Sequence, residues 1–228
     1  AATLDERERD RLFAAAVEFA AGRIPILAGV GTNDTRVSVE LACSAAKRGV
    51  DGLLVVTPYY NKPNRTGLVL HFAAIADATA LPVMLYNVPS RTSLDLEPRV
   101  AREIGERCKN VVALKEANAL PERVRNVAAQ SGLAVFAGED RAIADFMQHG
   151  ASGAVSVIGN LLPAEVAELV RCARPGGNSA RAAELVEFLA PLVRDLFIEV
   201  KPVPVKAALA RLARCREEVR LPLAPLEE

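Results

Sequence analysis

The chain has 228 residues, of which 51% are hydrophobic, so it is long enough for one large core and falls within the usual range of a single α/β barrel. Lysine plus arginine and aspartate plus glutamate number 28 each, and this zero net charge argues against a nucleic-acid partner or an acidic membrane surface. No apolar run approaches the roughly 20 residues of a membrane span, and the first residues are charged almost at once, so we expect neither a membrane anchor nor a signal peptide.

Short apolar runs alternate with longer amphipathic stretches along the chain. The apolar runs predict six buried strands, over residues 24–28, 53–56, 82–86, 111–114, 134–137 and 154–157. The amphipathic stretches predict helices over residues 4–20, 37–47, 68–78, 97–108, 120–131 and 140–149. This βαβα order indicates a parallel sheet, and the continuous apolar character of the strands indicates that both faces are covered.

A helical tail follows the last predicted strand, over residues 163–172, 180–197 and 203–215. We therefore expect residues 1–160 to form an incomplete (β/α) barrel and residues 161–228 to form the last barrel helix plus a C-terminal helical region. The chain opens inside a helix with no strand before it, so the predicted (β/α)8 TIM barrel has six of its eight strands.

The first strand is followed by a glycine-rich turn, Gly29-Val-Gly-Thr-Asn-Asp34. A dinucleotide-binding turn needs its third glycine where Asp34 stands, which removes the best signal for a doubly wound nucleotide-binding sheet. Reactive side chains instead follow strand after strand, and in a barrel these strand ends meet at one mouth. The pattern favours a barrel with one site at its mouth.

Cysteine and histidine usage argues against a metal centre. The four cysteines are far apart and form no C-x-x-C pair, which is typical of small buried side chains in a reducing cytosol. The two histidines, His71 and His149, lack the spacing of a metal pair. We expect a cytoplasmic protein with no cofactor and no histidine-based metal site.

Lys115 is the strongest candidate for a nucleophile. The chain has only six lysines, and this one directly follows the apolar strand 111–114. Burial there disfavours the ammonium and lowers its pKa, which supplies the free amine that attacks a carbonyl. The alternatives are a lysine whose stem reaches the barrel rim, or one that is paired with Glu116. Lys206, in the helical tail, is the second candidate.

Two aromatic motifs also lie at strand ends. Tyr86 ends one strand and Arg91 follows five residues later, so a phenol that carries protons and a guanidinium that grips a carboxylate stand close in sequence. Equally, Tyr86 could cap the core and Arg91 could pair with Asp95. The segment that contains Tyr60 is either a proline-framed packing loop or a loop that places a phenol in the site.

Five motifs in register resemble one enzyme family. They are Gly-Val-Gly-Thr-Asn-Asp at 29–34, Thr-Pro-Tyr-Tyr-Asn-Lys-Pro at 57–63, Leu-Tyr-Asn-Val-Pro-Ser-Arg-Thr at 85–92, Lys-Glu-Ala at 115–117 and Val-Lys at 205–206. In order and spacing they are similar to the dihydrodipicolinate synthase family over essentially the whole chain. The resemblance implies a lyase that condenses pyruvate with aspartate 4-semialdehyde to 4-hydroxy-tetrahydrodipicolinate, on the diaminopimelate route to lysine.

The resemblance also implies roles for individual residues. Lys115 matches the lysine that forms the Schiff base with pyruvate, and Tyr86 matches the tyrosine that carries protons beside it. Arg91 matches the arginine that receives the carboxylate of the semialdehyde. Tyr60 matches a tyrosine that a neighbouring subunit inserts into the site, which implies a homo-oligomer, a dimer or a homotetramer.

Two further positions, Gly138 and Val155, match backbone positions that line the pyruvate pocket of the family. One family motif, Gly-Thr-Thr-Gly-Glu, has no counterpart in this chain, and its threonine links the two tyrosines in the proton relay. Two alternatives therefore stay open. One is another pyruvate-dependent aldolase of the N-acetylneuraminate lyase superfamily, and the other is a truncated, catalytically impaired remnant.

Overall fold

The computed structural model describes residues 3–227, and the chain divides after Phe136 into two compact units. One sheet runs in the chain order β1-β2-β3-β4-β5-β6. Its strands are β1 Leu27–Gly29, β2 Gly52–Val56, β3 Val83–Asn87, β4 Val111–Glu116, β5 Ala134–Ala137 and β6 Gly153–Ala154. The pairings of β1 with β2, β2 with β3 and β3 with β4 are all parallel, as the alternation of strands and helices predicts.

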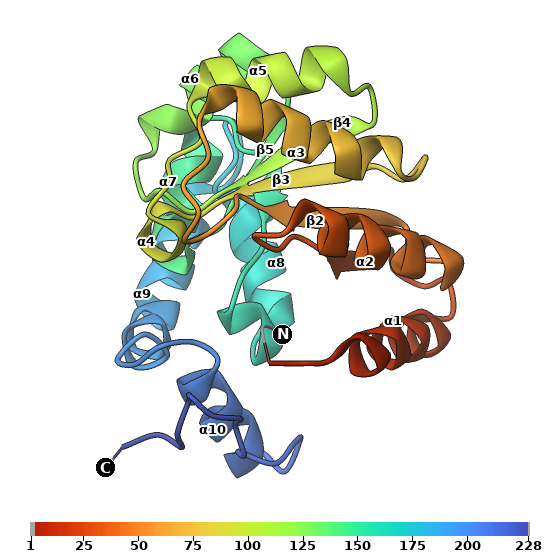
Figure 1. Cartoon of the computed structure of the whole chain (residues 1–228). Helices are drawn as coiled ribbons and strands as arrows, with labels where there is room; N and C mark the ends of the chain where they lie inside the picture. Colours follow the sequence, from red (N-terminus) through yellow and green to blue (C-terminus); the bar gives the residue numbers. More distant parts are fainter. Residues whose placement is uncertain (1–2, 228) are drawn as a thin grey trace. The chain divides into compact units, whose positions relative to one another are not determined.

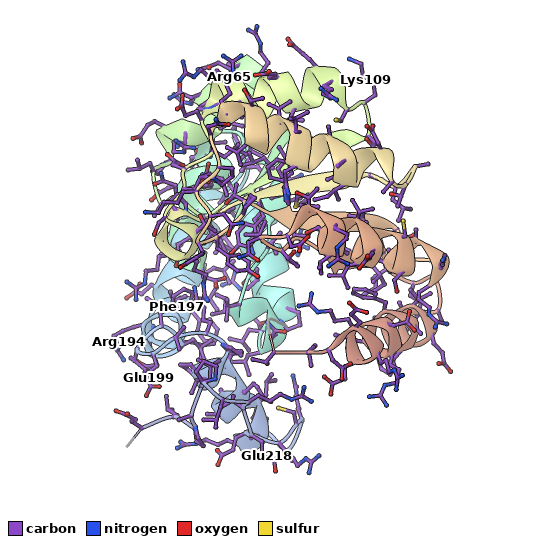
Figure 2. The ribbon with its side chains drawn as sticks, viewed as in Figure 1. Arg65, Lys109, Arg194, Phe197, Glu199 and Glu218 are labelled. Atoms are coloured by element: carbon purple, nitrogen blue, oxygen red, sulfur yellow. The ribbon has the colours of Figure 1, made fainter. Side chains whose placement is uncertain are left out.

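Helices separate the strands of the first unit. They are α1 Glu6–Ala20, α2 Thr35–Lys47, α3 Arg65–Asp77, α4 Pro89–Thr92, α5 Pro98–Arg107 and α6 Glu122–Ser131. Figure 1 shows α3 and α5 side by side next to β3 and β4. At the outer surface of these two helices, Arg65 of α3 forms an ion pair with Glu103 of α5 at 2.7 Å (Figure 2).

Side-chain caps explain where the longer helices begin. The Asp5 carboxylate accepts from the Glu8 backbone N–H, and the Glu8 carboxylate accepts from the Asp5 N–H, which together form a capping box. Asp34 caps α2 and Asn64 caps α3 in the same sense, each by accepting a backbone N–H of the first turn. Apolar spacing alone placed the starts of α2 and α3 two to three residues too late, because their first turns are polar.

The core of the first unit lies between the sheet and these helices. Leu53 and Val55 of β2 are fully buried, as is Leu85 of β3, whereas the outer helices carry the charged residues. Leu54 and Val56, on the other face of β2, are half-buried, so one face of this strand is covered more fully than the other. α1 is joined to α2 by Asp10, whose carboxylate accepts hydrogen bonds from Ser44 and Arg48.

The second unit is mainly helical. It contains the short 3-10 helices η1 Asp140–Ala142 and η2 Ile158–Asn160, with α7 Ile143–Gln148, α8 Pro163–Cys172, α9 Ser179–Asp195 and α10 Val203–Arg211. Just beyond α9, the Phe197 ring (Figure 2) is contacted by two cations: Arg141 Cζ lies 5.6 Å and Lys201 Nζ lies 3.7 Å from the ring centroid. These cation–π contacts fix the turn between α9 and α10.

His71 of α3 is a buried titratable group, so we expect the free energy of unfolding to depend on pH. Its Nδ1 lies 2.9 Å from the Thr35 hydroxyl, and its Nε2 has no hydrogen-bond partner within residues 3–227. Burial lowers the pKa of His71 from 6.5 to about 4, against a smaller opposing effect of the Asp34 charge. A charged ring would therefore hold a buried N–H donor without an acceptor.

We expect the free energy of unfolding to fall by up to roughly 3 kcal/mol between pH 7 and pH 4 because of His71. The unfolded chain takes up this proton below its ordinary pKa of 6.5, whereas the folded chain does so only near pH 4, so the stability present above pH 6.5 is lost as the pH falls. Denaturant unfolding across this range should show a smaller fall for His71→Asn. The control variant, His149→Asn, should keep the parental fall, and equal pH dependence of all three proteins would contradict the assignment.

Candidate active site

Lys115 and Tyr86 lie directly opposite each other at the ends of two neighbouring strands. Each is the second-to-last residue of its strand, and the parallel register of β3 and β4 pairs Tyr86 with Lys115. The Lys115 Nζ lies 4.1 Å from the centroid of the Tyr86 ring, and both side chains are half-buried. The two candidate residues, 29 positions apart in the sequence, therefore form one amine and phenol pair.

The chemistry of this pair suits a carbonyl substrate. A lysine amine adds to a ketone and loses water to form an imine, whose protonated nitrogen withdraws electrons from the adjacent carbon. The face of an aromatic ring stabilises such a cation, and a phenol can donate or accept the protons that the reaction moves. The pair offers both functions at one strand edge.

The other lysine that the sequence marks as a candidate has a different environment. Lys206 lies on α10, where its ammonium donates a hydrogen bond to the backbone carbonyl of Glu218. This contact joins the helix to the segment that follows it. The geometry favours a structural role for Lys206 and leaves Lys115 as the candidate nucleophile.

Loops that follow β2 and β3 are tied to the strand end that carries Tyr86. The Thr57 N–H donates to the Tyr86 carbonyl at 3.0 Å, and the Thr57 hydroxyl donates to the Thr92 hydroxyl at 3.3 Å. Thr92 ends the short helix α4, on which Arg91 is exposed. Arg91 is thus held near the strand end that carries Tyr86, with its guanidinium accessible to solvent.

Tyr60 is exposed and has an unusual backbone conformation. Its side chain is 88% exposed, and its φ of 72° lies in the left-handed region that tyrosine rarely adopts. Asn61, the next residue, is held by hydrogen bonds with Asn33 across two loops. Within the described chain the structure brings Tyr86 and Lys115 together, but it leaves most of the Tyr60 ring in solvent.

The two predicted pocket residues of the second unit lie at neighbouring strand ends. Gly138 directly follows β5, and the Val155 N–H, just after β6, donates to the Ala137 carbonyl at 2.8 Å. Both residues are half-buried. Positions 138 and 155 are therefore brought together by backbone pairing.

The sequence analysis did not predict a buried polar network on the face of β3 and β4 opposite to Tyr86 and Lys115. Glu116 and Asn87 are fully buried and hydrogen-bonded to each other, and Arg123 of α6 pairs with both Glu116 and Asp95. One of the alternatives raised above is therefore wrong, because Asp95 pairs with Arg123 rather than with Arg91. The Glu116 carboxylate also pairs with Arg123.

The strand alternation offered a signal for this network. Successive side chains of a strand point to opposite faces, so a site-facing Lys115 requires a Glu116 that faces the covering helices. A carboxylate there needs a buried cation as its partner. Arg123, in the first half of the next helix, was the candidate that sequence could have supplied.

The described residues contain no group of three or more histidine, cysteine, aspartate or glutamate side chains arranged to hold a metal ion. In residues 3–227, no helix combines the length and the apolar character that crossing a membrane requires. All four cysteines are free thiols.

Comparison with known proteins places this geometry in one family. The family model described as the dihydrodipicolinate synthetase family matches residues 1–228. The 4-hydroxy-tetrahydrodipicolinate synthase of Geotalea uraniireducens is 44% identical to this chain, and the alignment covers 99% of this chain and 78% of that protein.

Solved structures agree with this placement. The 4-hydroxy-tetrahydrodipicolinate synthase of Methylacidiphilum fumariolicum SolV is 42% identical, with a TM-score of 0.95 over 99% of this chain and 75% of that one. A dihydrodipicolinate synthase of Acinetobacter baumannii, solved in complex with pyruvate, is 38% identical, with a TM-score of 0.95 over 100% of this chain and 78% of that one. The predicted TIM-barrel fold class is confirmed, and the present chain spans about three quarters of the length of these two chains.

Proposed function

Because the chain belongs to the dihydrodipicolinate synthetase family, we propose that it is a lyase that condenses pyruvate with aspartate 4-semialdehyde to 4-hydroxy-tetrahydrodipicolinate, in the diaminopimelate route to lysine. The observation that carries this proposal for the chain itself is the pairing of Lys115 Nζ with the Tyr86 ring at 4.1 Å. An amine and a phenol at neighbouring strand ends can supply the nucleophile and the proton carrier for imine chemistry on a keto acid.

The proposed reaction begins with the Lys115 amine. It adds to the carbonyl carbon of pyruvate, and loss of water leaves a protonated imine that is bonded to Nζ. The adjacent methyl group then gives up a proton, and the resulting enamine attacks the aldehyde carbon of the semialdehyde, whose oxygen gains a proton. The amino group of the semialdehyde displaces Lys115 from the imine carbon, which closes the ring and restores the free lysine.

Tyr86 is proposed to carry protons in these steps. The Lys115 nitrogen lies 4.1 Å from the centroid of the Tyr86 ring, so the phenol adjoins the atom that forms the imine. The same ring face stabilises the positive charge of the imine nitrogen. Lys115 therefore bonds the substrate while Tyr86 moves protons beside it.

Activity is tested directly by incubating the protein with pyruvate and the semialdehyde and following formation of the cyclic product. We expect turnover that depends on both substrates. The A. baumannii relative has been solved with pyruvate, which supports pyruvate as the first substrate. Turnover with a sugar-acid aldehyde in place of the semialdehyde would instead favour another aldolase of the superfamily.

Arg91 is proposed to bind the carboxylate of the semialdehyde, because it is exposed at the loop that is tied to Tyr86. Loss of a charge-assisted contact is worth roughly 2 to 4 kcal/mol, so Arg91→Ala should lower kcat/KM for the semialdehyde by about 30-fold to 1000-fold. Imine formation with pyruvate alone should change far less. The control Arg99→Ala removes another exposed arginine, and parental kinetics in Arg91→Ala would refute this role.

We further propose that the protein is a cytoplasmic homo-oligomer, a dimer or a homotetramer. The exposed Tyr60 ring, held in a rare backbone conformation, supports a role at a subunit interface, where it would enter the site of a neighbouring copy. The four free thiols of the protein are typical of a reducing compartment.

Gly138 and Val155 lie at the ends of adjacent strands, and we propose that their backbones line the pyruvate pocket.

A further inference from the structure

The residues that directly follow the reactive pair form a second pair on the other face of the sheet. The register that joins Tyr86 to Lys115 also joins Asn87 to Glu116. Because side chains alternate along a strand, Asn87 and Glu116 point away from the reactive face. Both are fully buried. Any shift of these two residues along the strands would also move Tyr86 relative to Lys115.

Glu116 accepts hydrogen bonds from three directions. The Asn87 amide donates to Oε1 at 2.9 Å, the Asn118 N–H donates to Oε1 at 2.7 Å, and the Arg123 Nε donates to Oε2 at 3.1 Å. These donors come from the neighbouring strand β3, from the loop after β4 and from helix α6. The carboxylate therefore fixes the end of β4 to three separate parts of the first unit.

Asn87 is held as firmly as its partner. Its Oδ1 accepts from the Leu96 N–H at 2.9 Å, and its Nδ2 donates to Asp95 at 2.7 Å as well as to Glu116. In addition, its backbone carbonyl accepts from the Ala117 N–H at 2.9 Å, which continues the strand pairing past Lys115. The polar groups of the Asn87 side chain are thus all satisfied.

Arg123 joins these contacts through a guanidinium whose side chain is only 13% exposed. Its Nη1 donates to Asp95 at 3.0 Å and its Nη2 donates to the Leu96 carbonyl at 3.0 Å, while its Nε bonds Glu116. All three nitrogens are used, each with a different partner. Burial acts to raise the pKa of the Glu116 carboxyl, and the charge of Arg123 is the largest effect that opposes this.

We propose that Arg123, acting through Glu116 and Asn87, is a positioning residue that sets Lys115 against Tyr86 for imine formation. The cluster touches no reacting atom, but it fixes the strand ends one residue beyond each reactive side chain. This inference rests on the proposed function. Its chemical basis is that a misplacement of about 1 Å at reacting groups costs on the order of a hundredfold in rate.

The experiment compares Arg123→Met with the parent protein. We expect the rate of borohydride-trapped imine formation and kcat to fall by about tenfold to a hundredfold, with less than about twofold change in KM for the semialdehyde. A residue that only stabilises the fold would lower the unfolding midpoint without this split between kcat and KM. Arg65→Met removes an exposed Arg–Glu pair of the same unit, and it should keep parental rates.

Two more variants test the same role in case Arg123→Met does not fold. Asp95→Asn removes one partner of Arg123 at a side chain that is 42% exposed, and it should lower the trapping rate in the same direction by a smaller factor. In Arg123→Met/Glu116→Gln, the carboxylate left without its cation is also removed, so part of the lost rate should return.

The outcomes separate this inference from the proposed function. If the parent protein forms no imine at Lys115, the proposed function fails. If the parent forms the imine but Arg123→Met and Asp95→Asn, both folded, trap it at the parental rate, the positioning role alone is overturned. Equal losses in kcat and in semialdehyde affinity would also overturn it, because they would place Arg123 in substrate binding.

Discussion

Arginine in place of Lys115 should abolish both the covalent adduct with pyruvate and turnover. The side chain keeps its positive charge and its approximate length, but a guanidinium stays protonated at all working pH values and cannot attack a carbonyl. Removal of the nucleophile in a covalent mechanism costs more than about ten-thousandfold in kcat. Steady-state product formation and borohydride trapping should both fall to background.

The remaining lysines provide matched controls for this experiment. Lys206→Arg changes the other candidate lysine, which bonds the Glu218 carbonyl, and it should retain the adduct. Lys109→Arg changes an exposed lysine in the loop before β4 (Figure 2), and it should behave like the parent. Residual turnover of Lys115→Arg within tenfold of the parent would show that the reaction does not pass through this amine.

Phenylalanine in place of Tyr86 should separate proton transfer from imine formation. The ring over the Lys115 nitrogen remains, but the hydroxyl is lost, and proton transfer by a positioned side chain is worth about a hundredfold to ten-thousandfold in rate. We therefore expect kcat to fall by that factor, while the total amount of pyruvate that borohydride can trap at Lys115 stays near one equivalent per site. Single-turnover kinetics with each substrate would measure the two steps separately.

Tyr59→Phe is the control for loss of a phenol hydroxyl. Tyr59 is partly exposed in the loop after β2, and removal of its hydroxyl should change kcat far less than removal of the Tyr86 hydroxyl. Loss of both trapping and turnover in Tyr86→Phe would mean that the hydroxyl is needed for imine formation itself. Parental turnover in Tyr86→Phe would remove Tyr86 from the proton path.

Hydrophobic periodicity was sufficient to predict the order of the strands and of the longer helices, but individual side-chain hydrogen bonds set where they begin and end. β1 begins at Leu27 rather than at residue 24, because the Ile26 N–H donates to the Asp51 carboxylate at 2.7 Å and leaves the strand pairing. β6 ends at Ala154 because the Val157 N–H turns to the Asp140 carboxylate at 2.9 Å. Such bonds join residues far apart in sequence, so a pattern of single residues does not contain them.

The residues of the candidate site also differ in how far the sequence predicts them. Lys115 and Tyr86 could be predicted because a reactive side chain at the end of a buried strand is unusual and the family motifs mark both positions. The cluster behind them was predictable only in part: strand alternation marks Glu116 as facing the helices, but Arg123 meets Asp95 and Glu116 only after α6 has packed against the strands. The exposure of Tyr60 was also beyond the sequence, because it depends on a backbone with positive φ.

Mass mapping of the borohydride-trapped adduct determines whether Lys115 forms a covalent imine with pyruvate. The protein is incubated with pyruvate and borohydride, digested, and the modified peptide is sequenced. We predict one reduced pyruvate adduct on Lys115, absent when pyruvate is omitted. An adduct on Lys206, or no adduct in a protein that turns over both substrates, would contradict this prediction.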